Sequence, residues 1–328
     1  MVYNFCEYAL DNGSVIKPLL IDSKDLKGPS LSNPTIYNDG NKLYVNLRNL
    51  NYVLYHAEKE KFEHQWGKLV YVHREDDRTL TTHNVTGELD ENLNFVNYSH
   101  VDTSEHDVKP LWEFVGLEDC RLVRWDDKLY LSGVRRDTTT NGVGRMELSE
   151  IVQEDGKWKE VTRFRIPAPG KDNTYCEKNW MPIIDQPYHY VKWSNPIEIV
   201  KVDPEEKTCV TTFKSSKTIS EKDWRGSSHV IPYKDDQHIC FIHETDLWFD
   251  ECGRKNAKYR NRFLVWDKDW SLIQVSPLFA FFNCEVEFGC GMCQYKDGYL
   301  ITFGAQDNSA YVMNITSEAL ENFISGNI

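Results

Sequence analysis

The sequence lacks several features that define common classes of protein. No stretch approaches the ~20 consecutive apolar residues of a transmembrane helix, and Met1–Glu7 has neither the basic start nor the apolar run of a signal peptide. Positive charge is also scarce, since 38 Lys and Arg face 51 Asp and Glu, a net charge of −13 without any compensating basic run. Binding to bulk nucleic acid or to a membrane is therefore not expected, whereas a small anion in a locally basic pocket is compatible with this charge.

Cysteine is limited to nine scattered residues, an odd number without the spacing of a disulfide framework. Together with the lack of a leader, this predicts reduced thiols and a cytoplasmic location. Only Cys290 and Cys293 have the spacing of a metal or redox motif, and a structural zinc site would need a second such pair. We interpret both as small apolar residues of a strand, and we predict no metal and no cofactor.

Aromatic residues, by contrast, are abundant at 13% of the chain. They favour strands, and short alternating runs such as 42–48 and 128–134 are bounded by Asp, Asn and Gly turns. Helix is scarce: segment 317–324 is the one good amphipathic candidate, capped by Thr316 or Ser317. No linker rich in Pro, Gly or Ser divides the chain, so we expect a single domain over residues 1–328.

A unit of two apolar strands joined by a tight turn recurs five times along the chain. The copies begin with polar or glycine-rich residues near positions 33, 118, 178, 227 and 289. Weaker strand candidates between them, such as 209–213 and 262–267, would be outer strands. Five four-stranded units in 328 residues predict an all-β fold, a five-bladed β-propeller with a short C-terminal helix.

In a propeller the first strand of every blade starts at the central cavity, so the polar starts of the five copies are expected to converge. These residues are Asn33, Glu118, Asp119, Arg121, Lys178, Asn179, Arg225, Ser227, Ser228, Gly289 and Gly291. Carboxylates, amides and cations gathered in one concave place are what a sugar and an anion would need.

These segments resemble the motifs of family 130 of the glycoside hydrolases. The Glu-Asp-Cys-Arg of 118–121 is similar to its Glu-Asp-Pro-Arg motif, and the Lys-Asn-Trp-Met-Pro of 178–182 is similar to its third-blade segment. Segment 241–243 stands where the family has a strand ending in Tyr-His-Gly, and 288–307 is similar to its last blade. The resemblance implies a carbohydrate-active enzyme of a superfamily that contains β-mannoside phosphorylases, β-mannoside hydrolases and β-1,2-mannosyltransferases.

The resemblance also implies roles for individual residues. It makes Asp119 the catalytic acid or base, although an Asp–Arg pair that holds two blades together is an alternative for this residue. It implies a phosphate or donor site, to which we add two arginines as helpers; the set is Lys178, His243, Tyr259, Arg48 and Arg225. Alternatively, His243 is a core imidazole and the arginines form surface or inter-blade ion pairs.

Sugar hydroxyls are expected to contact a second set of polar side chains, namely Asn33, Glu118, Arg121, Asn179 and Asp307. Trp180 could offer a stacking face, or it could belong to the core. Glu285 and Glu287 stand where the family usually has apolar residues, and alternation would put both on one strand face. A second carboxylate in the cavity points to hydrolysis or to transfer onto an alcohol, because an attacking phosphate needs no base.

The departures from the family pattern favour its transferase-like branch. They include Glu285, Glu287 and the Arg-Gly-Ser-Ser-His of 225–229 in place of Gly-Gly-x-Pro-Pro. We predict inverting transfer from a nucleotide sugar or sugar phosphate to a hydroxyl acceptor, with inorganic phosphate or a nucleotide diphosphate as a partner. An intracellular β-glycoside phosphorylase or hydrolase is the alternative, and a non-catalytic sugar-binding propeller is a third interpretation. The sequence has no Asp-x-Asp motif flanked by strands, as many metal-dependent glycosyltransferases have, so we predict metal independence. The pair Asp126 and Asp127 indicates a turn.

Overall fold

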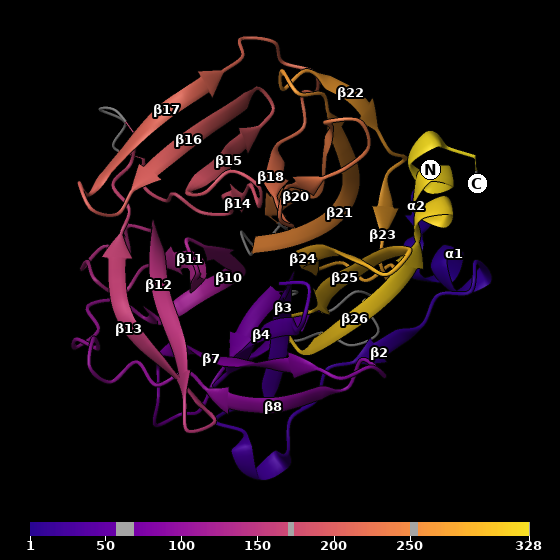
Figure 1. Cartoon of the computed structure of the whole chain (residues 1–328). Helices are drawn as coiled ribbons and strands as arrows, with labels where there is room; N and C mark the ends of the chain where they lie inside the picture. The colour runs from indigo at the N-terminus through magenta and orange to yellow at the C-terminus, as the bar shows by residue number, and fades with distance from the viewer. Residues whose placement is uncertain (57–68, 170–173, 250–254, 328) are drawn as a thin grey trace.

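The computed structural model describes residues 1–56, 69–169, 174–249 and 255–327. The regular structure of the described chain is mostly β-strand, with two short α-helices, which confirms the all-β class that we predicted. The structure arranges its sheets around a common centre, with the first strand of each repeat innermost and strands such as β8, β13 and β17 at the rim (Figure 1). This is the propeller arrangement that the internal repeat predicts.

Four sheets have a regular path of four strands. The first contains β3 (Ser30–Asn38), β4 (Leu43–Leu50), β7 (Leu80–Leu89) and β8 (Phe95–His100). The second contains β10 (Leu117–Trp125), β11 (Lys128–Arg135), β12 (Arg145–Glu154) and β13 (Lys157–Arg165). The third contains β14 (Met181–Pro182), β15 (His189–Ser194), β16 (Ile197–Asp203) and β17 (Thr208–Lys214). The last contains β24 (Glu287–Tyr295), β25 (Gly298–Ala305), β26 (Ser309–Thr316) and the N-terminal β2 (Ile16–Pro18).

The sheet built on the fourth repeat departs from this pattern, so the structure has four regular blades and not the five that we predicted. Its strands are β18 (Trp224–Gly226), β19 (Ile231–Pro232), β20 (His238–Phe249), β21 (Lys255–Trp266), β22 (Leu272–Val275), β23 (Phe279–Ala280) and β1 (Tyr3–Asn4). The first strand is interrupted between β18 and β19. There the hydroxyl of Ser228 accepts the N–H of Phe241 at 3.0 Å, a bond that a strand carbonyl would otherwise accept.

Two excursions leave the first sheet near the centre. One is the hairpin of β5 (Val53–His56) and β6 (Leu69–Val72), and the other is β9 (Phe114–Val115), which pairs with β7. Neither belongs to the repeat. Both bring side chains to the central cavity that the regular strands do not supply.

The helices lie together near the two chain ends (Figure 1). The helix α2 (Ser317–Ser325) confirms the predicted one, and the Thr316 hydroxyl caps it by accepting the N–H of Ala319 at 3.2 Å. The helix α1 (Phe5–Asp11) was not predicted, because two turns are too short to show a periodic pattern; a 3₁₀-helix covers Ser23–Asp25. In the described ranges, neither α-helix has the length and apolarity to span a membrane.

Candidate active site

Local distortions of the first strands turn polar side chains toward the centre. Asn33, Asp119 and Asn179 have positive φ angles of 45°, 50° and 62°, a left-handed conformation that Asn and Asp tolerate better than other side chains. The ladders of the first and second sheets shift register across 32–35 and 118–121, as bulges do. Bulges re-aim side chains, and the sequence supplies Asn or Asp where three sheets need this conformation.

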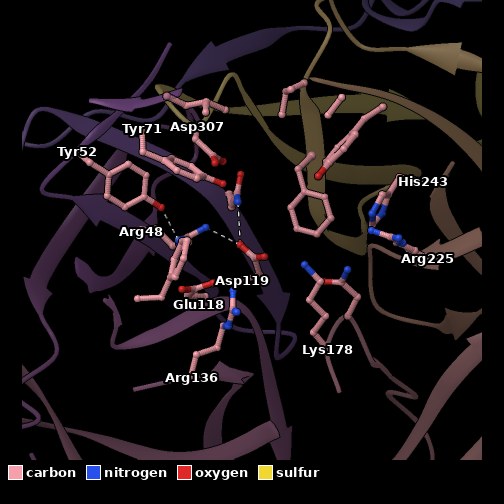
Figure 2. Close-up of a pocket in the computed structure, with 18 residues that line it drawn as sticks. Arg48, Tyr52, Tyr71, Glu118, Asp119, Arg136, Lys178, Arg225, His243 and Asp307 are labelled. Carbon is pink, nitrogen blue, oxygen red and sulfur yellow. Dashed lines mark hydrogen bonds and ion pairs between the residues drawn. The ribbon is translucent and has the colours of Figure 1, made fainter. Parts of the chain in front are cut away.

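These side chains line a central cavity of about 330 Å³. Most of the predicted site residues lie on its lining, with several of them labelled in Figure 2; they are Asn33, Arg48, Glu118, Asp119, Lys178, Asn179, Arg225, His243, Tyr259 and Asp307. Figure 2 shows Asp307, Glu118 and Arg48 on one side of the cavity and Arg225 with His243 on the other, with Asp119 between them. The structure therefore brings together residues separated by more than 200 positions in the sequence.

Two residues predicted to bind sugar lie outside the lining. Arg121 is fully buried, and its guanidinium donates to the carbonyls of Ser227 (2.8 Å) and Gly226 (3.1 Å). It therefore connects the second sheet to the irregular sheet of the fourth repeat. Trp180 is 1% exposed in a core cluster, and its indole N–H donates to Glu177 at 3.2 Å. Trp180 directly follows Asn179, which lines the cavity, and Arg121 lies two residues after Asp119. Neither side chain is on the lining, so a stacking face from Trp180 is not available.

The two glutamates expected to supply a second cavity carboxylate are also placed elsewhere. Glu287 is fully buried, and its carboxylate accepts the backbone N–H groups of Phe281, Phe282 and Cys284 at 2.5–2.8 Å. Glu285 precedes β24 and pairs with Lys258 at 3.1 Å. Because Glu285 is outside the strand, alternation does not relate the two side chains. Glu287 holds the loop before the last sheet through these backbone hydrogen bonds and does not face the cavity.

Asp119 is held by two direct partners. A guanidinium nitrogen of Arg48 lies 2.6 Å from its carboxylate, and the amide of Asn33 donates to the same oxygen at 2.9 Å. Burial by itself would raise the pKa of Asp119, but Arg48 and Arg121 more than offset burial, so the pKa lies below its ordinary value. The Asp119 carboxylate is therefore ionised at neutral pH.

The pKa values of the other two carboxyl groups of the cavity are shifted in the opposite direction. Burial raises the pKa of Glu118 to about 7, although Arg48 opposes this shift, and burial also raises the pKa of Asp307. Neither residue has an ion-pair partner of its own among the described residues. The cavity thus combines one firmly ionised carboxylate with carboxyl groups that hold their protons more tightly.

The far side of the cavity presents donors to an anion. Lys178 makes no ion pair with any residue that the structure describes, and Arg225 pairs with Asp223 at 2.6 Å. His243 shares a 2.8 Å hydrogen bond with the hydroxyl of Ser227. Burial, followed by Arg225, holds the pKa of His243 well below its ordinary value, so the imidazole is neutral. It is a neutral hydrogen-bonding group beside two cations, and not a third cation.

The phenol of Tyr259 completes this side. Its ring stacks on that of His243 with centroids 5.3 Å apart. Burial raises the pKa of Tyr259 to about 12, so the hydroxyl stays protonated and can donate.

Sequence reasoning missed several lining residues, which are Tyr52, Leu54, Tyr71, Phe114, Arg136, Ala257, Val286 and Phe288. One of them had a signal. Arg136 follows the second strand of the second repeat, and Arg48 lies near the end of the equivalent strand β4, whereas His243 lies midway along β20, near the end of the run 238–244 that the fourth repeat shows in the sequence. Aligning the ends of the second strands, as well as the starts of the first, would have identified it. Tyr71 lies on β6, outside the repeat, and had no such signal.

No family model and no curated protein sequence matches the chain. Among solved structures, it resembles a β-1,2-mannobiose phosphorylase from Listeria innocua (13% identity, TM-score 0.53, covering 94% of this chain and 96% of that chain). It also resembles a mannose phosphorylase from Leishmania mexicana in complex with phosphate ion (11%, 0.52, 95% and 92%). A GDP-Man-dependent mannosyltransferase from the same organism is similar as well (12%, 0.50, 92% and 90%). At these identities the likeness shows the fold, and these are the kinds of carbohydrate-active protein that the motifs indicated.

Proposed function

We propose that this chain catalyses inverting glycosyl transfer from a phosphate-activated sugar, a nucleotide sugar or a sugar phosphate, to a hydroxyl acceptor. The observation that carries the proposal is the ionised carboxylate of Asp119 facing Lys178, Arg225 and His243 across one cavity. An acceptor hydroxyl needs a group that takes its proton, and a phosphate leaving group needs cations and donors. Separate groups that line the same cavity can therefore meet the two requirements, as an inverting displacement needs.

The proposed step balances with these residues. The acceptor oxygen forms a bond to the anomeric carbon of the donor while its proton passes to Asp119. The bond from the anomeric carbon to the phosphate oxygen breaks, and its electron pair leaves with the phosphate. Lys178 and Arg225 offset the charge that develops there, and the neutral His243 and the Tyr259 hydroxyl can donate hydrogen bonds to it. Asn33, Asn179 and Asp307 would contact sugar hydroxyls.

The charge state of Asp119 favours this direction. A phosphorylase or a hydrolase acts on a glycoside and must protonate the departing glycosidic oxygen. Asp119 is held in the form that accepts a proton, and that form suits attack by a hydroxyl. The comparisons with a GDP-Man-dependent mannosyltransferase and with a phosphorylase that binds phosphate ion support a phosphate-bearing substrate in a fold of this kind.

The second candidate is a β-mannoside-type phosphorylase or hydrolase. The specific observation in its favour is Glu118, whose pKa of about 7 keeps a fraction protonated at neutral pH beside Asp119. A carboxyl group of this kind can donate a proton to a leaving oxygen. This alternative would make Glu118 the acid and would leave the cationic side for inorganic phosphate or for water.

The test is a panel of nucleotide sugars and sugar 1-phosphates, each with mono- and oligosaccharide acceptors, with released nucleotide or phosphate as the readout. We expect turnover with inversion, seen by NMR of the product anomer. We expect Asp119→Asn to lower kcat by about 10²- to 10⁴-fold and to keep donor binding. Sugar 1-phosphate formed from oligomannosides and phosphate would establish the phosphorylase instead, and unchanged turnover in Asp119→Asn would refute a catalytic Asp119. A propeller that only binds sugar would show binding and no turnover in the wild type.

A further inference from the structure

One wall of the cavity is apolar, in contrast to the charged side chains elsewhere on its lining. Leu54, Ala257 and Val286 form a small cluster against which Tyr259 packs. They come from three segments, namely β5, β21 and the loop before β24, and all of them line the same cavity as Asp119. Aliphatic side chains offer no hydrogen bond to a hydroxyl-rich ligand, so this wall suits a ligand with an apolar part.

The wall continues onto the hairpin of β20 and β21. Each of these strands has twelve residues, and β18 pairs with β20 only as far as Glu244. Beyond that point, residues 245–249 pair with β21 alone in the described part of the chain. The hairpin therefore projects past the inner strand of its own sheet, beside the cavity.

Strand alternation determines which side chains of this projection face the cavity. Leu247 is directly opposite Ala257 in the ladder, and Thr245 is opposite Tyr259. Directly opposed residues share a face of the sheet. Because Ala257 and Tyr259 line the cavity, as His243 does, Leu247 extends the same apolar face outward from its wall.

This extension is left open to solvent. The side chain of Leu247 is 45% exposed, while the neighbouring Ala257 is buried. A single exposed leucine needs no explanation, but one that continues an apolar cavity wall makes a contiguous surface, as binding sites do. The occupant that such a surface fits is a group that follows the sugar out of the cavity.

We infer that the acceptor carries an apolar alkyl or aryl group, either as the aglycone of a glycoside or as part of an alcohol. This group lies along Val286, Leu54 and Leu247. The acceptor's reacting hydroxyl reaches Asp119, and the donor occupies the cationic side. This inference rests on the proposed function and names its acceptor class. The affinity comes from apolar area removed from water on both surfaces.

The test is donor-free binding of methyl β-mannoside and octyl β-mannoside, the latter below its micelle concentration, measured by calorimetry. We expect octyl mannoside to bind wild type about tenfold more tightly, as partial burial of apolar groups predicts. Leu247→Asn is expected to remove most of this preference and to leave methyl mannoside binding unchanged. Trp248→Asn is the matched control, because Trp248 is the next residue of β20, is similarly exposed at 41%, and lies on the opposite strand face.

Three results would overturn the inference: equal binding of the two mannosides, no binding of octyl mannoside, or equal losses in Leu247→Asn and Trp248→Asn. The assay needs no donor, so its outcome is independent of turnover. If no activated sugar reacts and octyl mannoside still binds through Leu247, the proposed transfer is wrong and the apolar subsite stands. If transfer to free saccharides is seen and octyl mannoside gains nothing, the transfer stands and the aglycone assignment is wrong.

Discussion

At the scale of single residues, two adjacent carboxyl groups of the candidate site differ in charge state because they have different partners. The carboxylate of Asp119 accepts hydrogen bonds from Arg48 and Asn33, whereas Glu118 forms no ion pair among the described residues. The positive φ of Asp119 turns it away from the regular strand alternation. Both side chains therefore line the same cavity, one ionised and the other with a raised pKa. Sequence analysis identified the pair but could not assign charges, because Arg48 is 71 positions from Asp119.

The pKa of Glu118 predicts a pH dependence of donor use. Its carboxyl is protonated below about pH 7 and ionised above it, which adds negative charge beside Asp119. An anionic donor should then bind less well, although Lys178, Arg48 and Arg136 also act on the site. We expect kcat/KM for the donor to fall as pH rises through about 7, and Glu118→Gln to flatten this fall. A pH profile of both proteins between about pH 5.5 and 8.5 checks this.

The same shift predicts a stability change with a defined sign. Because the folded-state pKa of Glu118 is raised from 4.5 to about 7, its stabilising contribution is fully present below the unfolded pKa and is lost as pH rises through about 7. The wild type should therefore lose more Tm than Glu118→Gln between about pH 5 and 8. Parallel Tm curves for the two proteins would show that Glu118 does not titrate in this range.

At the scale of elements, the sequence predicted where strands begin better than where side chains point. The starts of the five repeats were found from their polar residues, and ten of the predicted site residues line the cavity. Arg121 was misplaced because the register shift across 118–121 changes the alternation, and Trp180 was misplaced because it follows Asn179, whose positive φ breaks the extended conformation just before β14. The β5–β6 hairpin and the projection of β20 and β21 lie outside the repeat, so their side chains could not be anticipated from it.

The loop between β23 and β24 gives a prediction at this scale. The Glu287 carboxylate accepts three backbone N–H groups in a fully buried position, and Glu287→Gln would turn an amide donor toward them. We expect the free energy of unfolding to fall by about 1–3 kcal/mol, with kcat of the folded fraction unchanged. The control is Glu285→Gln, whose ion pair with Lys258 is worth roughly 1 kcal/mol or less. Urea unfolding and single-temperature kinetics measure both quantities.

The opposite pattern would restore a catalytic interpretation of these glutamates. Loss of kcat without loss of stability in Glu287→Gln would place its carboxylate in the reaction. The same result in Glu285→Gln would assign that role to Glu285.

At the scale of the whole molecule, the ends of the chain meet. The N-terminal β2 pairs with β26 and completes the last sheet, and β1 pairs with β23. The repeat in the sequence contains no sign of this closure, because the N-terminal strands precede the first copy and are only two and three residues long. The irregular fourth-repeat sheet was missed for a similar reason: a Ser hydroxyl in place of a strand carbonyl is a geometric feature and not a sequence pattern.

Closure makes the short N-terminal helix a test of the whole fold. Phe5 of α1 is fully buried, and its ring lies 4.7 Å from those of Phe279 and Phe323, centroid to centroid. We expect Phe5→Ala to lower the free energy of unfolding by about 3–5 kcal/mol. Leu10→Ala, in the same helix at 53% exposure, should change it by roughly 0.5 kcal/mol or less. If the sheets form one cooperative unit, tryptophan fluorescence and turnover will be lost together in a single urea transition; turnover that outlasts a first transition would show that the closure is separable from the site.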